Sequence, residues 1–298
     1  MPAGVIGHIA RTLCILSAVA FAPFAKAQDV DGAVTLPAAS NWILDYADDS
    51  CALRRVFGEE GKLVFLEMRQ FAPNDSLQNI VSSDDIGFRH RPVEFQFLPD
   101  PREPVERPTM AVTLDRWGEG FMINDTLQTA SHRSALNYAY WDPAERAARE
   151  ESITGIRVAR GFAEPIFLKT GSLAKPMQMV RECVDELLTH WGVDAEAQRT
   201  LLRAVSPKDL QGSTRRMVRS YPARRLNRGE QAMLRIRMNV DENGQGTSCK
   251  AQLDVADEDF EQTACKFLMR DLSFNPALGK DGEPIASFWT TTVLYKLP

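Results

Sequence analysis

The chain has 298 residues, of which 44% are hydrophobic, with 35 Lys and Arg against 40 Asp and Glu. This apolar content is sufficient for packed cores and excludes wholesale disorder. The mildly acidic balance argues against a nucleic-acid partner. The length fits one large domain or two ordinary ones.

The first 27 residues have the pattern of a secretory signal peptide. Arg11 precedes an apolar run of 12 residues, 13–24, and Ala25-Lys26-Ala27 is a small-x-small cleavage site. That run is too short to cross a bilayer core of ~30 Å as a helix. The alternative is an uncleaved membrane anchor. We expect export to the periplasm, cleavage after Ala27, and no integral membrane span in the mature chain.

Four cysteines remain after cleavage, and an even number in an exported chain favours disulfides. Cys249 lies on the apolar face of a predicted strand, and Cys265 lies near the edge of the apolar face of a predicted helix. The two thiols can therefore meet across the layer. By elimination Cys51 pairs with Cys183, the alternative being two buried free thiols.

The pattern of residues 28–205 predicts a domain with both helices and strands, to which we assign no function. Alternating apolar residues over 62–71 and a run over 93–98 predict strands. An apolar stripe from Val180 to Trp191 predicts a helix that begins near Pro176 and ends at Gly192. Asp48 and Asp49 are interpreted as a solvated turn.

A basic linker is predicted at residues 206–220. Eight Lys and Arg against one Asp lie within residues 203–228, in a chain that is otherwise acidic. Pro207 and Gly212 interrupt any long periodicity. Such a stretch can touch anionic lipid, lipopolysaccharide or peptidoglycan, but a solvated linker is the favoured interpretation.

The pattern of residues 221–298 predicts a small module whose elements follow in the order strand, strand, helix, strand. Apolar and polar residues alternate from Leu234 to Val240, Asn243-Gly244 is a hairpin turn signal, and alternation resumes over 248–255. Residues 257–271 predict a helix, and residues 288–297 are rich in β-forming residues. A helix on a three-stranded antiparallel sheet is the natural packing. The fold class is thus α+β.

This module resembles the C-terminal domain of TonB. Tyr221-Pro222-Ala223-Arg224 is similar to the Tyr-Pro-x-x-Ala opening of that family, although Arg225 stands where the family has Ala. The hairpin, the helix followed by Phe274-Asn275-Pro276, and Gly282-Glu283-Pro284 before the last strand follow in the family's order.

The resemblance implies a binding role. TonB C-terminal domains pair an edge strand with a short peptide of outer-membrane receptors, in the service of transport across that membrane. True transducers add an uncleaved inner-membrane helix and a Pro-rich spacer, whereas here a globular region of about 170 residues precedes the module. The implied partner is an envelope protein or a receptor peptide, and a homodimer is a further possibility.

The last strand of the module should pair with the first and leave its outer edge free for an extended peptide. It contains no Pro, so all its backbone groups can join a ladder. The residues expected to form this peptide-binding edge are Phe288, Trp289, Thr290, Thr291, Thr292 and Val293.

No pattern in the sequence indicates catalysis, a metal site or a cofactor. His90, His132 and His190 have no partner at a metal-ligand spacing, and no nucleophile elbow or phosphate-binding glycine loop occurs. Lys169-Thr170-Gly171 and Ser172-Leu173-Ala174-Lys175 resemble penicillin-binding motifs, but they are adjacent and cannot face each other. We therefore expect no enzyme. The alternatives are a secreted hydrolase with its site in residues 28–205, and a structural protein that contacts peptidoglycan.

Overall fold

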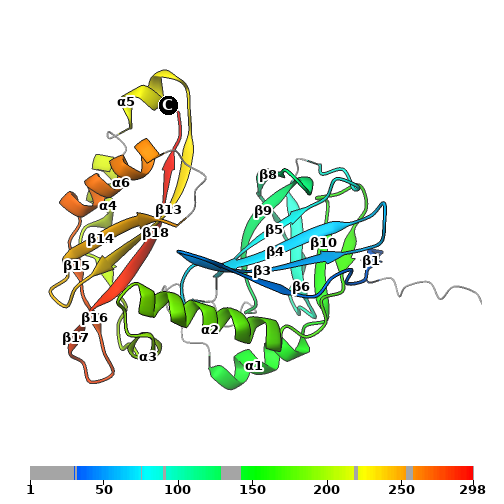
Figure 1. The fold of residues 1–298 in the computed structure, drawn as a ribbon, viewed down its shortest axis with the longest axis horizontal. Helices are drawn as coiled ribbons and strands as arrows, with labels where there is room; N and C mark the ends of the chain where they lie inside the picture. The colour runs from blue at the N-terminus through cyan, green and yellow to red at the C-terminus, as the bar shows by residue number, and fades with distance from the viewer. Residues whose placement is uncertain are drawn as a thin grey trace, which may run out of the picture.

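The computed structural model describes residues 30, 32–74, 76–89, 92–128, 142–217, 221–252 and 258–297. The predicted signal peptide lies outside these ranges. Strands and helices occupy separate layers, so the predicted α+β class is confirmed. Figure 1 shows the N-terminal sheets at one end and the C-terminal module, yellow to red, at the other. Helix α2 (Ala174–His190) runs along the underside between them.

The larger N-terminal sheet is a six-stranded antiparallel sheet in the order β2-β3-β4-β5-β9-β8. The strand predicted over 62–71 is its third strand. The six strands are β2 (Ile43–Ala47), β3 (Ser50–Phe57), β4 (Val64–Gln70), β5 (Ser76–Ser82), β9 (Gly118–Thr126) and β8 (Met110–Leu114).

The second sheet has five strands in the order β1-β11-β10-β6-β7, and only the β1–β11 pair is parallel. Its strands are β1 (Val34–Leu36), β11 (Ile166–Leu168), β10 (Gly155–Ala159), β6 (Val93–Leu98) and β7 (Glu106–Arg107). The strand predicted over 93–98 is β6.

Aromatic rings from both sheets form the centre of the N-terminal core. Phe121 of β9 meets Phe95 of β6 edge-to-face, with ring centroids 6.4 Å apart. Phe88 and Phe162 contact the same Phe121 ring. All four rings are buried, so the two sheets pack face to face around them.

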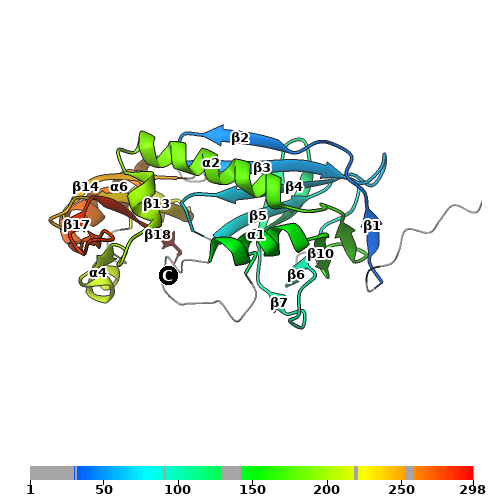
Figure 2. The same cartoon turned by 90° about the horizontal axis from the view of Figure 1, so that it is seen from below.

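Helix α2 covers the part of the same sheet face that the second sheet leaves open, as Figures 1 and 2 show. Its predicted stripe is buried, from Val180 to Leu188. Cys183 in that stripe is bonded to Cys51 of β3. Helix α1 (Pro143–Ser152) lies beside α2, and its N-terminus is capped by the Asp142 carboxylate, which accepts from two backbone N–H groups.

The C-terminal module contains a three-stranded antiparallel sheet in the order β14-β13-β18, with helix α6 (Glu258–Asp271) on one face. The strands are β14 (Gly246–Ala251), β13 (Ala232–Val240) and β18 (Ser287–Tyr295). Leu234, Ile236 and Met238 are fully buried beneath α6. Cys249 of β14 is bonded to Cys265 of α6.

Short elements connect these layers. Residues 206–217, in the stretch assigned to a linker, hold β12 and α4, and β12 pairs with β15. The short elements are α3 (Ala195–Arg199), β12 (Ser206–Pro207), α4 (Leu210–Met217), α5 (Ala223–Asn227), β15 (Phe274–Asn275), β16 (Ala277–Leu278) and β17 (Pro284–Ile285).

Both predicted disulfides, Cys51–Cys183 and Cys249–Cys265, are present. Two such bonds fit an oxidising compartment outside the cytoplasm. Among the described residues, no helix has both the length and the apolar content needed to cross a bilayer.

We predict that Cys51→Ser/Cys183→Ser lowers stability more than Cys249→Ser/Cys265→Ser. The first bond closes a span of 132 residues and the second a span of 16. From loop-closure entropy, the first bond should stabilise the folded chain by up to about 5 kcal/mol and the second by about 3 kcal/mol. Urea denaturation of both double variants measures the difference. A smaller loss for the Cys51/Cys183 variant would contradict the prediction.

A second prediction concerns the buried carboxylate of Glu67 on β4. Burial raises its pKa, but hydrogen bonds and charges from Arg69 and Arg54 outweigh this effect and leave the pKa below its ordinary value. A depressed pKa contributes stability above the unfolded-state pKa, and that stability is lost as the pH falls through the folded-state pKa. Glu67→Gln should therefore cost about 1–3 kcal/mol at neutral pH.

This loss should shrink in acid, since the wild-type carboxyl is then protonated as well. Denaturation of wild type and Glu67→Gln between neutral and acidic pH checks the expectation. A cost that stayed the same at every pH would show that the charge of Glu67 contributes nothing.

Candidate functional site

Strand β18 is an edge strand. It pairs antiparallel with β13 without interruption, from Val240 opposite Ser287 to Ala232 opposite Tyr295. Within the described residues β13 is its one hydrogen-bonded strand neighbour. The last strand therefore pairs with the first strand of the module, as the sequence predicted, and its other side faces away from the sheet.

The direction of each β18 amide follows from one hydrogen bond on the opposite side of β13. The Gln252 N–H donates to the Arg235 carbonyl at 2.7 Å, so Arg235 points its backbone groups away from β18. Directions alternate along a strand, and Ile236 therefore points toward its partner, Thr291. Thr291 bonds inward to β13, whereas its neighbours Thr290 and Thr292 point outward.

Burial divides β18 into a covered half and an open half. Ser287, Phe288 and Trp289 are buried, Thr290 and Thr291 are half-buried, and Thr292 is exposed. Val293 and Tyr295 are buried beneath α6, but Leu294 between them is 54% exposed. The outward row that reaches solvent is thus Thr290, Thr292 and Leu294, which we call the open edge.

The start of β18 is held by the N-terminal half of the chain. Gln198 of α3 donates to the Ala286 carbonyl at 3.3 Å and accepts a hydrogen bond from the Ser287 hydroxyl. Phe288 packs edge-to-face on Trp191, at the end of α2. Two of the six predicted edge residues, Phe288 and Trp289, are therefore covered. The backbone N–H and C=O groups of Thr291 and Val293 point toward β13. Thr290 and Thr292 belong to the open edge.

The sheet face opposite α6 is docked on the N-terminal sheets. Arg237 of β13 forms an ion pair with Asp49 at 2.9 Å, with side-chain exposures of 9% and 12%. The same guanidinium lies 4.0 Å from the Trp191 ring centroid. Asn239 donates to the Trp191 carbonyl at 2.9 Å. The interpretation of Asp49 as a solvated residue was wrong, because a cation far away in the sequence covers it.

Two further residues extend this docked face toward β14. Arg235 lies over the Phe71 ring at 4.6 Å, and burial lowers the pKa of its guanidinium. Gln252 donates to the carbonyls of Asp49 and Phe71, at 3.2 and 3.1 Å. The docked face therefore orients the module firmly while β18 keeps its open edge.

We predict strong coupling between Arg237 and Asp49. Arg237→Met or Asp49→Asn alone leaves one buried group without its partner and should cost about 3–5 kcal/mol. The double variant should cost clearly less than the sum of the single variants. Arg228→Met is the matched control, because Arg228 is 64% exposed and should change stability by less than about 0.5 kcal/mol. Additive losses in urea denaturation would contradict the coupling.

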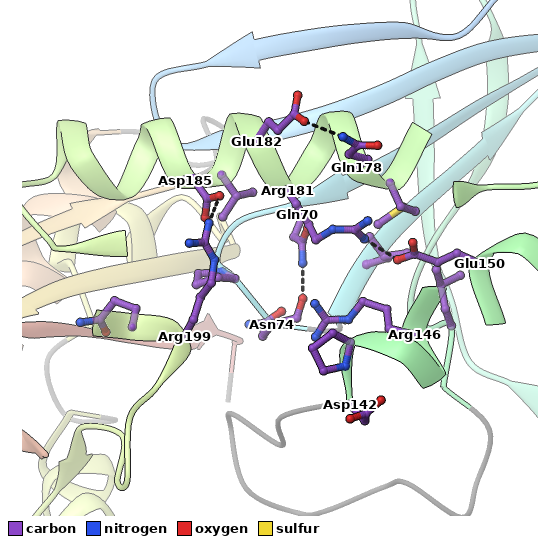
Figure 3. Close-up of a pocket in the computed structure, with 17 residues that line it drawn as sticks. Gln70, Asn74, Asp142, Arg146, Glu150, Gln178, Arg181, Glu182, Asp185 and Arg199 are labelled. Atoms are coloured by element: carbon purple, nitrogen blue, oxygen red, sulfur yellow. Dashed lines mark hydrogen bonds and ion pairs between the residues drawn. The ribbon is translucent and has the colours of Figure 1, made fainter. Parts of the chain in front are cut away.

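A pocket of about 690 Å³ lies beside the docked face, between α1, α2, α3 and the β4–β5 connection. Figure 3 places Gln70 and Asn74 in its middle, with Arg199 and Asp185 on one side and Arg146, Arg181 and Glu150 on the other. Its volume falls in the range of small-molecule sites. Gln198 lines this pocket as well, so the pocket adjoins the start of β18.

Two ion pairs and two further polar contacts involve the charged groups of the pocket. Arg181 bonds Glu150, Arg199 bonds Asp185, and Gln178 donates to Glu182 at 2.9 Å. Asp142 caps α1. Burial raises the pKa of Asp185, an effect that Arg199 opposes.

In the described part of the chain no group of His, Cys, Asp and Glu is arranged to hold a metal ion. His190 ends α2 and is exposed, while His90 and His132 lie outside the described residues.

The remaining sequence motifs have local structural partners. Ser172 donates to Glu151 at 2.8 Å, and Thr170 donates to the Gly171 carbonyl, so the penicillin-binding-like stretch is a polar loop before α2. In the basic stretch, Arg225 pairs with Glu230 and Asp259. Tyr221 packs on Tyr295 and Phe260 beneath the module.

No family model, curated protein or solved structure matches this chain. The open edge and the pocket therefore provide the basis for a functional conclusion.

Proposed function

We propose that this chain is a periplasmic binding protein, exported with cleavage after Ala27, whose C-terminal module captures an extended peptide by strand addition to β18. Its partner is an envelope protein or a peptide of an outer-membrane receptor. The resemblance of residues 221–298 to TonB C-terminal domains agrees with this role and links it to transport at the outer membrane. We propose no enzymatic activity.

The open edge is the observation that carries the proposal. Thr290, Thr292 and Leu294 direct N–H and C=O groups away from β13, and no described residue bonds them. An added strand satisfies such groups, each backbone bond contributing about 0.5–1.5 kcal/mol. Natural edges are usually protected by Pro, bulges or charge. None of these devices interrupts β18 between Ser287 and Tyr295.

The docked face supports the same role. An edge strand accepts a peptide with less loss of entropy when its sheet is already held rigid. Arg237, Asn239 and Phe288 fix the sheet against the N-terminal half, and they do so without covering Thr292. The N-terminal sheets thus act as the support on which the edge is presented.

The pocket does not favour the hydrolase alternative, since its carboxylates serve ion pairs and a helix cap.

The decisive test is a proline at an outward position. Peptides selected on the full chain from a displayed library of ten-residue sequences should lose roughly two- to twelvefold in affinity on Thr292→Pro, because one outward N–H is removed. Thr292→Val is the matched control, since it keeps that N–H and the β-branched shape, and it should bind normally. Isothermal titration with synthetic peptides measures both.

Thr291→Pro is the control for the assigned direction. It removes a bond to β13, so it should lower the melting temperature of the module, whereas Thr292→Pro should leave it nearly unchanged. Equal binding of the selected peptides by Thr292→Pro and wild type would refute strand addition at this edge.

A further inference from the structure

Arg235 of β13 is a half-buried cation without a counter-charge. Its Nε is buried with no hydrogen-bond partner, and its guanidinium lies over the Phe71 ring at 4.6 Å. Among the described residues no carboxylate forms an ion pair with it, whereas its neighbour Arg237 pairs with Asp49 at 2.9 Å. A half-buried charge without a partner is costly, so this guanidinium favours an anion from outside the chain.

The neighbours of Arg235 on the sheet face show from which side an anion can reach it. Gln252, which follows β14, and Arg237, further along β13, are both buried against the N-terminal half. Thr292 lies directly opposite Arg235 on β18 and is exposed. Met233, two residues before Arg235, is half-buried. The accessible side of Arg235 is therefore the side that faces the open edge.

A strand added to the open edge brings one of its side chains within reach of Arg235. The added residue opposite Thr292 projects on the same face of the sheet as Thr292 and Arg235. Neighbouring strands lie about 4.8 Å apart, so this residue stands roughly 10 Å from the Arg235 backbone. An arginine and a glutamate side chain together span that distance across the short Thr292. Met233 and Leu294, on the same face, carry no charge that competes for the guanidinium.

We propose that Arg235 selects an acidic residue of the captured peptide, and that its guanidinium donates to the carboxylate of a Glu or Asp placed beside Thr292. This inference rests on the proposed function and adds specificity to it, because backbone pairing alone demands little of a peptide's side chains. The planar guanidinium presents parallel donors that match the two oxygens of a carboxylate. The partner is thus an extended segment with an acidic residue at one fixed position.

The first probe is N-acetyl-L-glutamate N-methylamide, which carries the carboxylate and is too short to form a strand. Titrated into the full chain with nitrogen-labelled arginines, it should shift the Arg235 Nε–H resonance and saturate on the order of 10 mM. The Arg237 resonance is the internal control, because that guanidinium is already paired with Asp49. The glutamine analogue, which lacks the charge, should shift neither resonance. An unshifted Arg235 resonance, or an equal shift with the glutamine analogue, would overturn the site.

A double-variant cycle with the selected ten-residue peptides measures the pair itself. These peptides should share one Glu or Asp, and its change to Gln or Asn should weaken binding to wild type roughly 10- to 150-fold, the range of a charge-assisted hydrogen bond. Arg235→Met should bind the acidic and the amide peptide equally. It removes an unpaired charge and keeps an apolar chain over Phe71, so the melting temperature should stay close to wild type. Arg228→Met, which removes an exposed guanidinium of the same module, should discriminate like wild type.

The outcomes separate the acidic site from strand addition. Thr292→Pro removes a backbone donor and keeps the Arg235 guanidinium, so the glutamate probe should still shift Arg235 in that variant. If Thr292→Pro binds peptides normally while Arg235 still distinguishes Glu from Gln, strand addition fails and the acidic site stands. Selected peptides without a shared acidic residue, or equal discrimination by Arg235→Met and wild type, would overturn the acidic site even if Thr292→Pro weakened peptide capture.

Discussion

The guanidinium of Arg237 fixes the orientation of the C-terminal module relative to the N-terminal half of the molecule. It forms an ion pair with Asp49 at the tip of the β2–β3 hairpin, and it stacks on Trp191 at the end of α2. One side chain thus fixes the module relative to both the large sheet and its covering helix. A charge buried this deeply requires its partner, because loss of Asp49 would leave the guanidinium buried and uncompensated.

This docking determines which part of the module remains accessible. The sheet has two faces and two edge strands, β14 and β18: α6 covers one face, and the N-terminal half covers part of the other. The far half of the outer edge of β18 extends beyond the docked contacts. The Cys51–Cys183 bond reinforces the arrangement, since it fixes α2, which carries Trp191, to β3 next to Asp49.

The sequence predicted those features that local pattern controls. Alternation from Leu234 to Val240 and the stripe from Val180 to Leu188 predicted a strand and a helix that the structure confirms. Both cysteine pairings followed from the faces on which the thiols lie and from elimination. The fold class and the pairing of β18 with β13 could therefore be predicted from the sequence.

The docked face and the pocket could not be predicted from the sequence, for a physical reason. Arg235, Arg237 and Asn239 alternate with apolar residues just as solvent-facing residues do, and only a contact 188 residues away reveals that Arg237 is buried. Gln70 ends an ordinary strand, and it lines a pocket only because α1, α2 and α3 converge around it. Long-range assembly leaves no local periodicity to detect. The direction of each β18 amide likewise required the Gln252–Arg235 hydrogen bond.

Amide hydrogen exchange along β18 shows whether this ordered strand presents an outward row of unpaired amides. In the full chain without added peptide, the N–H groups of Thr292 and Leu294 should exchange fast, while those of Thr291 and Val293, bonded to β13, should be protected. We predict this two-residue alternation. Uniform protection from Thr290 to Leu294 would show that another strand already occupies the edge, and would contradict it.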